Sequence, residues 1–366
     1  MRILQGNSKP FTKAYTYGIL YISIMAQVSH QTKSKHNIDM LHGPLLGKIV
    51  LFSLPLAASS ILQQLFNSAD VAVVGRFASS QALAAVGATS SSINLLINLF
   101  VGLSLGANVV IASYIGQQKE RHIAGAVHTV VSLALASGVF LLLVGQLLAR
   151  PLLGAMNTPE DVIDQAVHYL KIYFGGMPFV MLYNFGSAIL RAKGDSRRPL
   201  YSLTVSGIVN VLLNLLLVIV FRLGVAGVAI ATVIANAVSS GIILHCLLHE
   251  EAPFRLNLHA LALKKEHIVR VVKIGAPAGL QGMVFSFSNV CIQSAINSFG
   301  SDAIAGSAAA NNFEAFAFFT VSAFTQACVT FTSQNYGAHQ FDRCRRVFKI
   351  SMACGIVSNL VMVGLF

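Results

Sequence analysis

Long apolar runs recur along most of the chain and are separated by short polar connections. Each run exceeds the roughly 18 residues that a helix needs to cross a lipid bilayer. The alternating pattern of transmembrane strands does not occur. The pattern therefore predicts an all-α, polytopic membrane protein with nine spans. Their predicted bounds are about 49–75, 83–113, 123–149, 164–190, 200–221, 225–248, 268–297, 303–333 and 346–366.

Composition and charge placement agree with this fold class. Only 10% of the 366 residues are charged, too few to cover the surface of a soluble domain, and 55% are hydrophobic. The formal net charge is +12, but 21 of the 25 Lys and Arg residues fall on the side of the membrane that holds the N-terminus. This asymmetry predicts a cytoplasmic N-terminus. It also explains the net charge without a nucleic-acid partner. We expect a multi-pass protein of the plasma (inner) membrane.

The first and seventh predicted spans resemble each other when they are shifted by 222 residues. The matched pairs include Val50/Val272, Pro55/Pro277, Asn67/Asn289, Phe77/Phe299, Ser79/Ser301, Ala88/Ala310 and Tyr114/Tyr336, and one slipped residue then matches Gly116 with Gly337. Six spans per repeat predict two six-helix bundles related by a pseudo-two-fold along the membrane normal, a transporter architecture. Chance similarity of composition is the alternative explanation.

The repeat divides the chain into four predicted parts. Residues 1–39 form a disordered or spurious extension, with Met40 as an alternative start, and 40–250 form the N-terminal bundle. Residues 251–267 form a cytoplasmic loop, and 268–366 form an incomplete second bundle with three spans. The repeat predicts three further spans, so we expect either a truncated product or a fragment of a twelve-span protein.

Two acidic residues, Asp70 and Glu314, lie well inside predicted spans. An acid at the bilayer centre costs about 2.5–3.5 kcal/mol on insertion scales, so each needs a reason. Gln63, Asn67 and Asp70 are spaced i, i+4, i+7 and therefore share one helical face. We expect Asp70 and Asn214 to line a cavity in the first bundle, with Glu314 at similar depth in the second.

Amides accompany the two acids on several spans. The further candidate cavity-lining or ion-coupling residues are Gln64, Asn94, Asn98, Asn210, Asn214 and Asn311. Such stripes either line a wet cavity or bind helices together through hydrogen bonds worth about 0.6 kcal/mol each. Pro55 and Pro277 either bend their helices or lie harmlessly in a first turn, and their closeness to the predicted starts favours the first turn.

Motifs of enzymes are absent from the sequence. It contains no G-x-x-x-x-G-K-[ST] phosphate loop, no H-E-x-x-H pair and no C-x-x-C pair among its five cysteines. We expect neither an enzyme, nor an organic cofactor, nor a structural metal site.

Several stretches closely resemble the multidrug and toxic compound extrusion (MATE) family, and most closely its bacterial DinF-like branch. They are "GPLLGKIVLFSLPLAASSILQQLFNSADVAVVGRF", "ALAAVGATSS", "LSLGANVVIASYIGQ", "ILRAKGDSRRPLYSL" and "FTSQNYGAHQ". The resemblance covers residues 40–366. It implies two six-helix bundles in a V-shaped antiporter that exports cationic or amphipathic compounds in exchange for H+ or Na+.

The resemblance also implies roles for single residues. Asp70 matches the first-helix aspartate that couples H+ or Na+, Pro55 matches a proline associated with helix bending, and Asn210 matches the fifth-helix asparagine of the same site. Asn214 stands where many members have a second aspartate, so either Asp70 couples alone or Glu314 shares the task. A bound Na+ is therefore possible at Asp70.

We expect a monomeric cation-coupled antiporter whose partners are small cationic or amphipathic substrates and the lipid bilayer. The alternatives are a lipid-linked oligosaccharide flippase of the same superfamily and a nonfunctional truncated product. A flippase would need a larger, basic cavity, whereas these spans hold acids and amides. A channel or a membrane-embedded enzyme is a further alternative; a channel would conduct ions without coupling.

Overall fold

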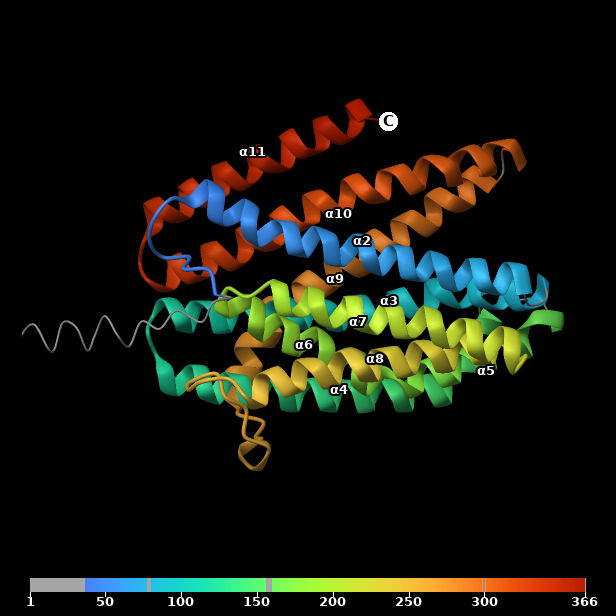
Figure 1. Cartoon of the computed structure of the whole chain (residues 1–366), viewed down its shortest axis with the longest axis horizontal. Coiled ribbons are helices and arrows are strands. Elements are labelled where there is room, and N and C mark those ends of the chain that lie inside the picture. Colours follow the sequence, from blue (N-terminus) through green and yellow to red (C-terminus); the bar gives the residue numbers. More distant parts are fainter. Residues whose placement is uncertain (1–36, 78–79, 156–159, 298, 300, 366) are drawn as a thin grey trace, which may run out of the picture. The chain divides into compact units, whose positions relative to one another are not determined.

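The computed structural model describes residues 37–77, 80–155, 160–297, 299 and 301–365, and residues 1–36 of the predicted extension 1–39 lie outside them (Figure 1). No strand occurs in these ranges. The helices, in chain order, are α2 (Leu45–Phe77), α3 (Ser80–Gly116), α4 (Glu120–Ala155), α5 (Glu160–Gly175), α6 (Met177–Lys193), α7 (Arg197–Asn214), the π-helix η1 (Leu215–Val220), α8 (Gly224–Leu248), the 3-10 turn η2 (Leu258–Ala260), α9 (Lys265–Asn297), α10 (Ser301–Gly337) and α11 (Phe341–Leu365).

The protein is an all-α, polytopic membrane protein. Seven stretches of the described residues are long and apolar enough to cross a membrane. Large apolar side chains such as Leu147 and Val284 are exposed, which suits a surface that faces lipid. The predicted last span corresponds to α11, which is not among the seven; Arg345, Arg346 and Lys349 lie in its first half.

The predicted span 164–190 corresponds to two consecutive helices, α5 and α6. The interruption lies at Gly176, directly before a helix whose second residue is Pro178. Pro178 lacks the backbone N–H that a continuous helix would use in its i→i−4 hydrogen bonds, so the series of helical hydrogen bonds is interrupted here. Two hydrogen bonds, Gly176 N to Tyr173 O at 3.0 Å and Val180 N to Gly176 O at 3.2 Å, carry the chain across the break.

The helix lengths support the internal repeat. Both α2 and α9 have 33 residues, and both α3 and α10 have 37. The ends of α3 and α10 also contact each other reciprocally: a Cβ on Gly116 would lie 1.9 Å from the Gln334 carbonyl oxygen, and a Cβ on Gly337 would lie 2.2 Å from the Ser113 carbonyl oxygen. A shift of 221 residues converts one contact into the other. This exchange is what a local two-fold axis requires.

Two glycine pairs bring the backbones of α3 and α9 together. A Cβ on Gly102 would lie 2.2 Å from the backbone nitrogen of Gly279, and a Cβ on Gly106 would lie 2.7 Å from that of Gly275. Both helices therefore carry glycines four residues apart, the spacing that allows membrane helices to cross closely. Larger side chains at these positions would separate the two helices.

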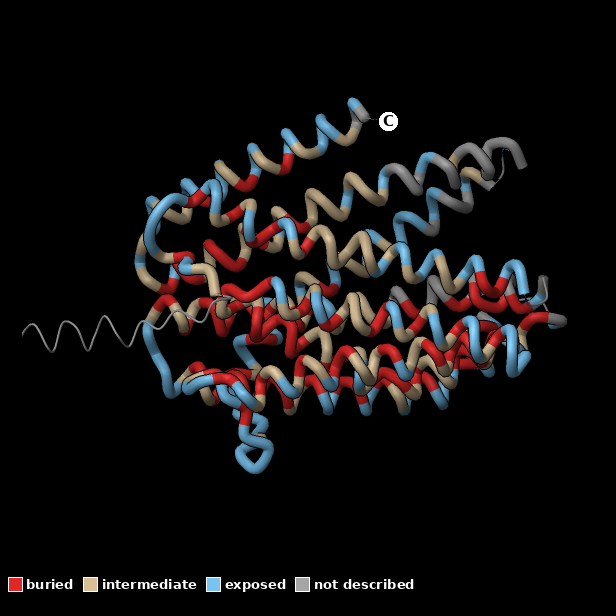
Figure 2. Tube along the Cα trace, in the orientation of Figure 1, coloured by how far each residue is buried: buried red, intermediate tan, exposed pale blue. Residues whose placement is uncertain are grey.

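A buried amide links α3 to two other helices. Asn108 is 3% exposed; its Nδ2 donates to the carbonyl oxygen of Ala188 on α6 at 3.0 Å, and its Oδ1 accepts from Thr330 Oγ1 on α10 at 3.0 Å. Figure 2 shows buried positions along the helices that surround α3. The larger apolar cluster there joins α3, α4, α5, α6 and α8 through side chains such as Leu141, Phe174 and Phe185.

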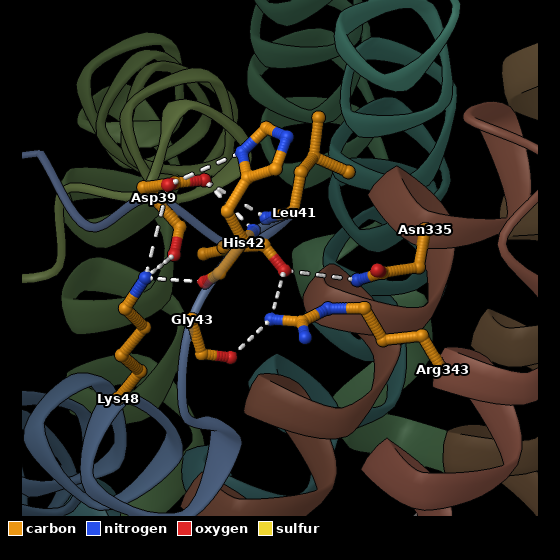
Figure 3. A network of polar contacts seen from close by, with 8 residues as sticks. Asp39, Leu41, His42, Gly43, Lys48, Asn335 and Arg343 are labelled. Carbon is orange, nitrogen blue, oxygen red and sulfur yellow. Dashed lines mark hydrogen bonds and ion pairs between the residues drawn. The ribbon is translucent and has the colours of Figure 1, made fainter.

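The segment that precedes α2 is held by α10 and α11 (Figure 3). Asn335 on α10 and Arg343 on α11 both donate to the carbonyl oxygen of Met40, at 3.1 and 3.4 Å. Lys48 Nζ donates to the carbonyl oxygen of Asp39 at 2.7 Å. The Met40 side chain is itself buried. The start of α2 is thereby anchored to the second half of the chain.

An ion-pair network connects the ends of α6, α7 and α8. The side chain of Glu250, which follows α8, is 5% exposed and lies 2.5 Å from Lys193 Nζ. Its other oxygen accepts from the guanidinium of Arg198, whose Nε lies 3.0 Å from Asp195 Oδ2. The Lys193 ammonium also lies 5.1 Å from the centre of the Phe254 ring. These contacts hold three helix ends in one arrangement.

Pro55 lies inside α2 as its eleventh residue, and Pro277 lies inside α9. The prediction that both prolines occupy a first turn is therefore wrong. Both helices begin before the predicted spans, at Leu45 and Lys265, so each proline lies more than two turns inside its helix. The bending role of Pro55 stays a prediction.

Candidate ion-binding site

Asp70 contacts polar groups from two other helices. Its Oδ1 accepts a hydrogen bond from Asn214 Nδ2 at the end of α7, and its Oδ2 accepts from Thr232 Oγ1 on α8 at 3.4 Å. Asn214 is fully buried, and Asp70 is half-buried. The structure thus brings Asp70 together with Asn214, as the sequence predicts.

Asn210 completes a ring of contacts around the carboxylate. Asn214 Nδ2 donates to Asn210 Oδ1 at 3.2 Å, and Asn210 Nδ2 lies 3.5 Å from Thr232 Oγ1. The carbonyl oxygen of Val228 lies 2.9 Å from the same Thr232 Oγ1, so the single proton of this hydroxyl is shared between Val228 and Asp70. Asn214 Oδ1 is buried without a hydrogen-bond partner among the described residues. The site therefore combines one carboxylate with amide and hydroxyl oxygens, and one of its oxygens is free.

Local structure explains why Asn210 and Asn214 face α2. They are one helical turn apart, so both point to the same side of α7. On that side Gly207 has no side chain, and Phe66 of α2 packs against it: a Cβ on Gly207 would lie 1.8 Å from Phe66 Cε2. Directly after Asn214 the helix widens into η1, with Phe221 N bonded to Leu216 O at 3.1 Å. Such π-turns are frequent at functional sites.

Other predicted site residues do not join this cluster by hydrogen bonds. Gln63 and Asn67 are exposed on α2, and Gln64 is half-buried. Asn98 Nδ2 donates to Ser286 Oγ on α9 at 2.8 Å, which fits the alternative in which an amide binds two helices together. A cavity-lining role of Gln63, Gln64 and Asn67 stays a prediction.

The structure gives no contacts to the Asp70 cluster for the three remaining predicted site residues. Glu314 is exposed on α10, and its carboxylate has no hydrogen bond to another described side chain. The side chains of Asn94 and Asn311 lie outside the described part of the structure. A role for Glu314 beside Asp70 therefore stays a prediction.

Sequence reasoning missed Thr232 and two tyrosines. Tyr169 and Tyr173 on α5 stack with ring centres 6.1 Å apart, and both lie within electrostatic range of the Asp70 carboxylate. Their spacing of four residues places both on one face of α5. That spacing was the available signal, but aromatic pairs of this kind are common in helix cores.

Comparisons with known proteins identify the family. A family model described as MatE matches residues 55–216 and 277–366. The chain belongs to the MatE family. A relative from Bacillus subtilis (strain 168), "Probable multidrug resistance protein YoeA", is 30% identical over 321 residues, which are 86% of this MatE chain and 68% of the relative. "Probable multidrug resistance protein NorM" of Thermotoga maritima is 26% identical over 295 residues, which are 79% of this chain and 63% of the relative.

The MatE chain thus spans about two thirds of the length of these relatives. A solved structure described as "Outward-facing conformation of a multidrug resistance MATE family transporter of the MOP superfamily" superposes with a TM-score of 0.83 at 22% identity, covering 89% of this chain and 72% of the other. "Crystal structure of MATE in the bent conformation" gives 0.82 at 22% identity, covering 89% and 73%. Both share the fold. The MatE family is one of transporters, which points to transport and away from catalysis.

Proposed function

We propose that the protein is a cation-coupled antiporter that exports cationic or amphipathic compounds by alternating access. One observation carries this proposal: the Asp70 carboxylate receives hydrogen bonds from a neutral amide and a hydroxyl, and it forms no ion pair with any basic residue of the described chain. A negative charge among apolar helices gains strongly from binding a cation when no resident cation neutralises it. The names of the relatives, multidrug resistance proteins, support an efflux role.

The same oxygens suit either coupling ion. Sodium prefers oxygen ligands, as other hard cations do, and the Asp70 carboxylate, the Oδ1 atoms of Asn210 and Asn214, and Thr232 Oγ1 lie in one cluster. A proton on Asp70 would turn the carboxyl group into a donor. Asn214 can then rotate its free Oδ1 toward Asp70 and accept this bond. No organic cofactor is part of the proposal.

We also propose the arrangement in which this site works. Residues 40–250 and 268–366 act as two bundles joined by the loop 251–267, in the plasma (inner) membrane, with a cytoplasmic N-terminus and as a monomer. Bending of α2 at Pro55 would change the position of Asp70 relative to Asn214. An ion bound at Asp70 shifts the balance between two conformations only by its difference in affinity for them.

The test is ethidium export from cells under an imposed sodium gradient and then under a proton gradient. Asp70→Asn should reduce gradient-driven export to background while the amount of protein in the membrane is unchanged. Glu120→Gln removes an exposed acid at the start of α4 and should export normally. Glu314→Gln tests whether that acid shares the coupling. Full gradient-driven export by Asp70→Asn would refute the proposal.

A further inference from the structure

The connector between α8 and α9, residues 249–264, forms a loop that extends away from the helices (Figure 1). Its first part is attached to the end of α8: Leu256 is 2% exposed, and its backbone N–H donates to the carbonyl oxygen of Leu247 at 2.9 Å. Beyond Leu256, one hydrogen bond joins the described connector to the helices that precede it. In this bond the backbone N–H of Asn257 donates to Nε2 of His128 on α4, at 3.0 Å. A single histidine thus supplies the polar contact that fixes the second part of the connector.

The partners of the two ring nitrogens define the protonation state of His128. Nδ1 lies 2.6 Å from the carbonyl oxygen of Ala124, one turn earlier in α4, and a carbonyl oxygen only accepts, so Nδ1 carries a proton. Nε2 faces the backbone N–H of Asn257, which only donates, so Nε2 carries none. The contact therefore requires the neutral Nδ1–H tautomer. In the imidazolium both nitrogens are donors, and the Asn257 N–H would meet another N–H.

The helices that pack against α4 are α3, α5, α6 and α9. Of these, α5 meets the far end of α4, at Gln146 and Arg150. The charged and titratable groups of α5 are Glu160, Asp161, Asp164, His168, Tyr169, Lys171 and Tyr173. The corresponding groups of the elements near His128 are Glu120, Arg121 and His122 on α4, Lys119 before it, Tyr114 on α3, Tyr183, Arg191 and Lys193 on α6, Lys265, Glu266, His267, Arg270 and Lys273 on α9, and His249, Glu250, Glu251, Arg255, His259 and Lys264 in the connector.

The acids of this region are not placed to hold a proton on His128. Among the described residues, none of them forms an ion pair or a hydrogen bond with the ring. Glu250 pairs with Lys193, and Glu266 pairs with Arg270 at 3.2 Å. The protonation of His128 is therefore coupled to its own two contacts, and of these only the contact with Asn257 requires a ring without a proton on Nε2.

The second part of the connector leads directly into α9, whose start packs against α3 and α4. A Cβ on Gly125, three residues before His128, would lie 2.8 Å from His267 Nε2 and 3.4 Å from Lys264 Nζ. His267 Nδ1 also lies 3.3 Å from the hydroxyl oxygen of Tyr114 at the end of α3. The contact of His128 with the connector is thus part of the junction at which the second half of the chain begins.

We propose that His128 is a pH-sensitive switch, which fixes the connector to α4 while its ring is neutral and releases residues 257–264 when the ring is protonated. Histidine is the side chain that commonly changes charge between about pH 5 and 8. Protonation removes the bond to Asn257 but leaves the bond to Ala124, because Nδ1 keeps its proton. Since release takes up one proton, the ratio of attached to released connector falls as pH falls, by at most about ten-fold per pH unit. The switch is independent of the Asp70 cluster and of the proposed transport.

Amide hydrogen exchange of the full chain in detergent micelles tests the switch, read by mass spectrometry on peptides that cover residues 255–264. Protection is expressed relative to the unfolded chain at the same pH, so the intrinsic pH dependence of exchange cancels. Protection at Asn257 should fall about 2- to 10-fold at acid pH, the loss expected for one hydrogen bond. Peptides from α4 and α8 should stay protected, which distinguishes release of the connector from acid unfolding.

Two uncharged variants separate the acceptor from the charge. His128→Gln places an amide oxygen near the position of Nε2 and should keep the connector protected at both neutral and acid pH. His128→Asn is too short to reach Asn257, so its connector should exchange at both pH values as fast as the wild type does at acid pH. His259→Gln removes an exposed histidine of the same connector and should retain the wild-type pH response.

NMR of the protein labelled with 15N-histidine gives an independent reading of the ring. The His128 signals, identified by their absence from His128→Gln, should show the Nδ1–H tautomer at neutral pH. An Nε2–H tautomer, a pH response that persists in His128→Gln or disappears in His259→Gln, or equal protection of the wild-type connector at both pH values would overturn the proposal. So would a loss of protection in α4 and α8 that accompanies the loss in the connector.

Discussion

Replacing Glu250 by glutamine should destabilise the protein by about 3 kcal/mol. Breaking a buried ion pair by removing one partner typically costs about 3–5 kcal/mol, because the other charge stays buried without compensation. The side chains of Lys193 and Arg198 are 13% and 26% exposed. Arg198 keeps its contact with Asp195 at 3.0 Å, whereas Lys193 has no second acid among the described ion pairs. We therefore expect the lower end of the range.

Unfolding of the purified protein in detergent micelles, followed with denaturant or heat, measures this difference. Glu251→Gln removes the same charge from the adjacent, exposed position and should change the free energy of unfolding by less than about 0.5 kcal/mol. If Glu250→Gln and Glu251→Gln lowered the free energy of unfolding equally, the effect would come from net charge and not from the buried ion-pair network.

The Glu250 carboxylate also makes the stability of the folded protein depend on pH, and the direction of this dependence follows from its pKa. Burial raises the pKa of Glu250, but the hydrogen bonds and charges of Lys193 and Arg198 outweigh burial, so its pKa lies below the ordinary 4.5. The unfolded chain therefore binds the proton first as pH falls. The stabilisation is fully present above pH 4.5 and is lost as pH decreases through the folded-state value. In Glu250→Gln this part of the acid sensitivity should be missing.

Three further predictions concern helix packing and the Asp70 cluster. Gly279→Ala should lower stability, because its Cβ would lie 2.5 Å from the Leu99 carbonyl oxygen, whereas Gly282→Ala on the same helix meets nothing closer than 3.6 Å and should be neutral or stabilising; thermal unfolding separates the two. Asn108→Leu should cost about 1–3 kcal/mol in the same assay, since it removes the buried hydrogen bonds from Asn108 to Ala188 on α6 and to Thr330 on α10. Thr232→Val should reduce ion-driven ethidium export while Thr232→Ser preserves it, because only the serine keeps the hydroxyl that reaches Asp70; equal export by both would exclude this contact from coupling.

The main members of the Asp70 cluster could be found from the sequence. A carboxylate inside an apolar run raises the free energy of membrane insertion, so Asp70 is recognisable as a candidate from the sequence. The spacing of Asn210 and Asn214 places them on one face of their helix. Thr232 could not be found in this way. A threonine in a membrane helix usually satisfies its hydroxyl on its own backbone, as Thr232 also does with Val228, so its second contact leaves no trace in the sequence.

The errors of prediction have a common physical origin. Hydropathy records how apolar a stretch is but not whether its hydrogen-bond ladder is continuous, so it could not locate the break at Gly176 within the predicted span 164–190. It also gives the apolar middle of a helix rather than its first turns, so the predicted start at residue 49 put Pro55 too close to a helix start, whereas α2 begins at Leu45. The repeat was more reliable, because matched positions such as Gly116 and Gly337 are constrained by the same reciprocal contact.

The π-helix η1 also has an evolutionary consequence. A π-turn holds one residue more than the α-helical turn it replaces, so it originates as a single-residue insertion. We expect relatives with a regular helix in this place to align with a one-residue gap between Leu215 and Val220. Deleting one residue there would rotate everything beyond it by about 100°, so the outer end of this helix would present a different set of side chains to its neighbours.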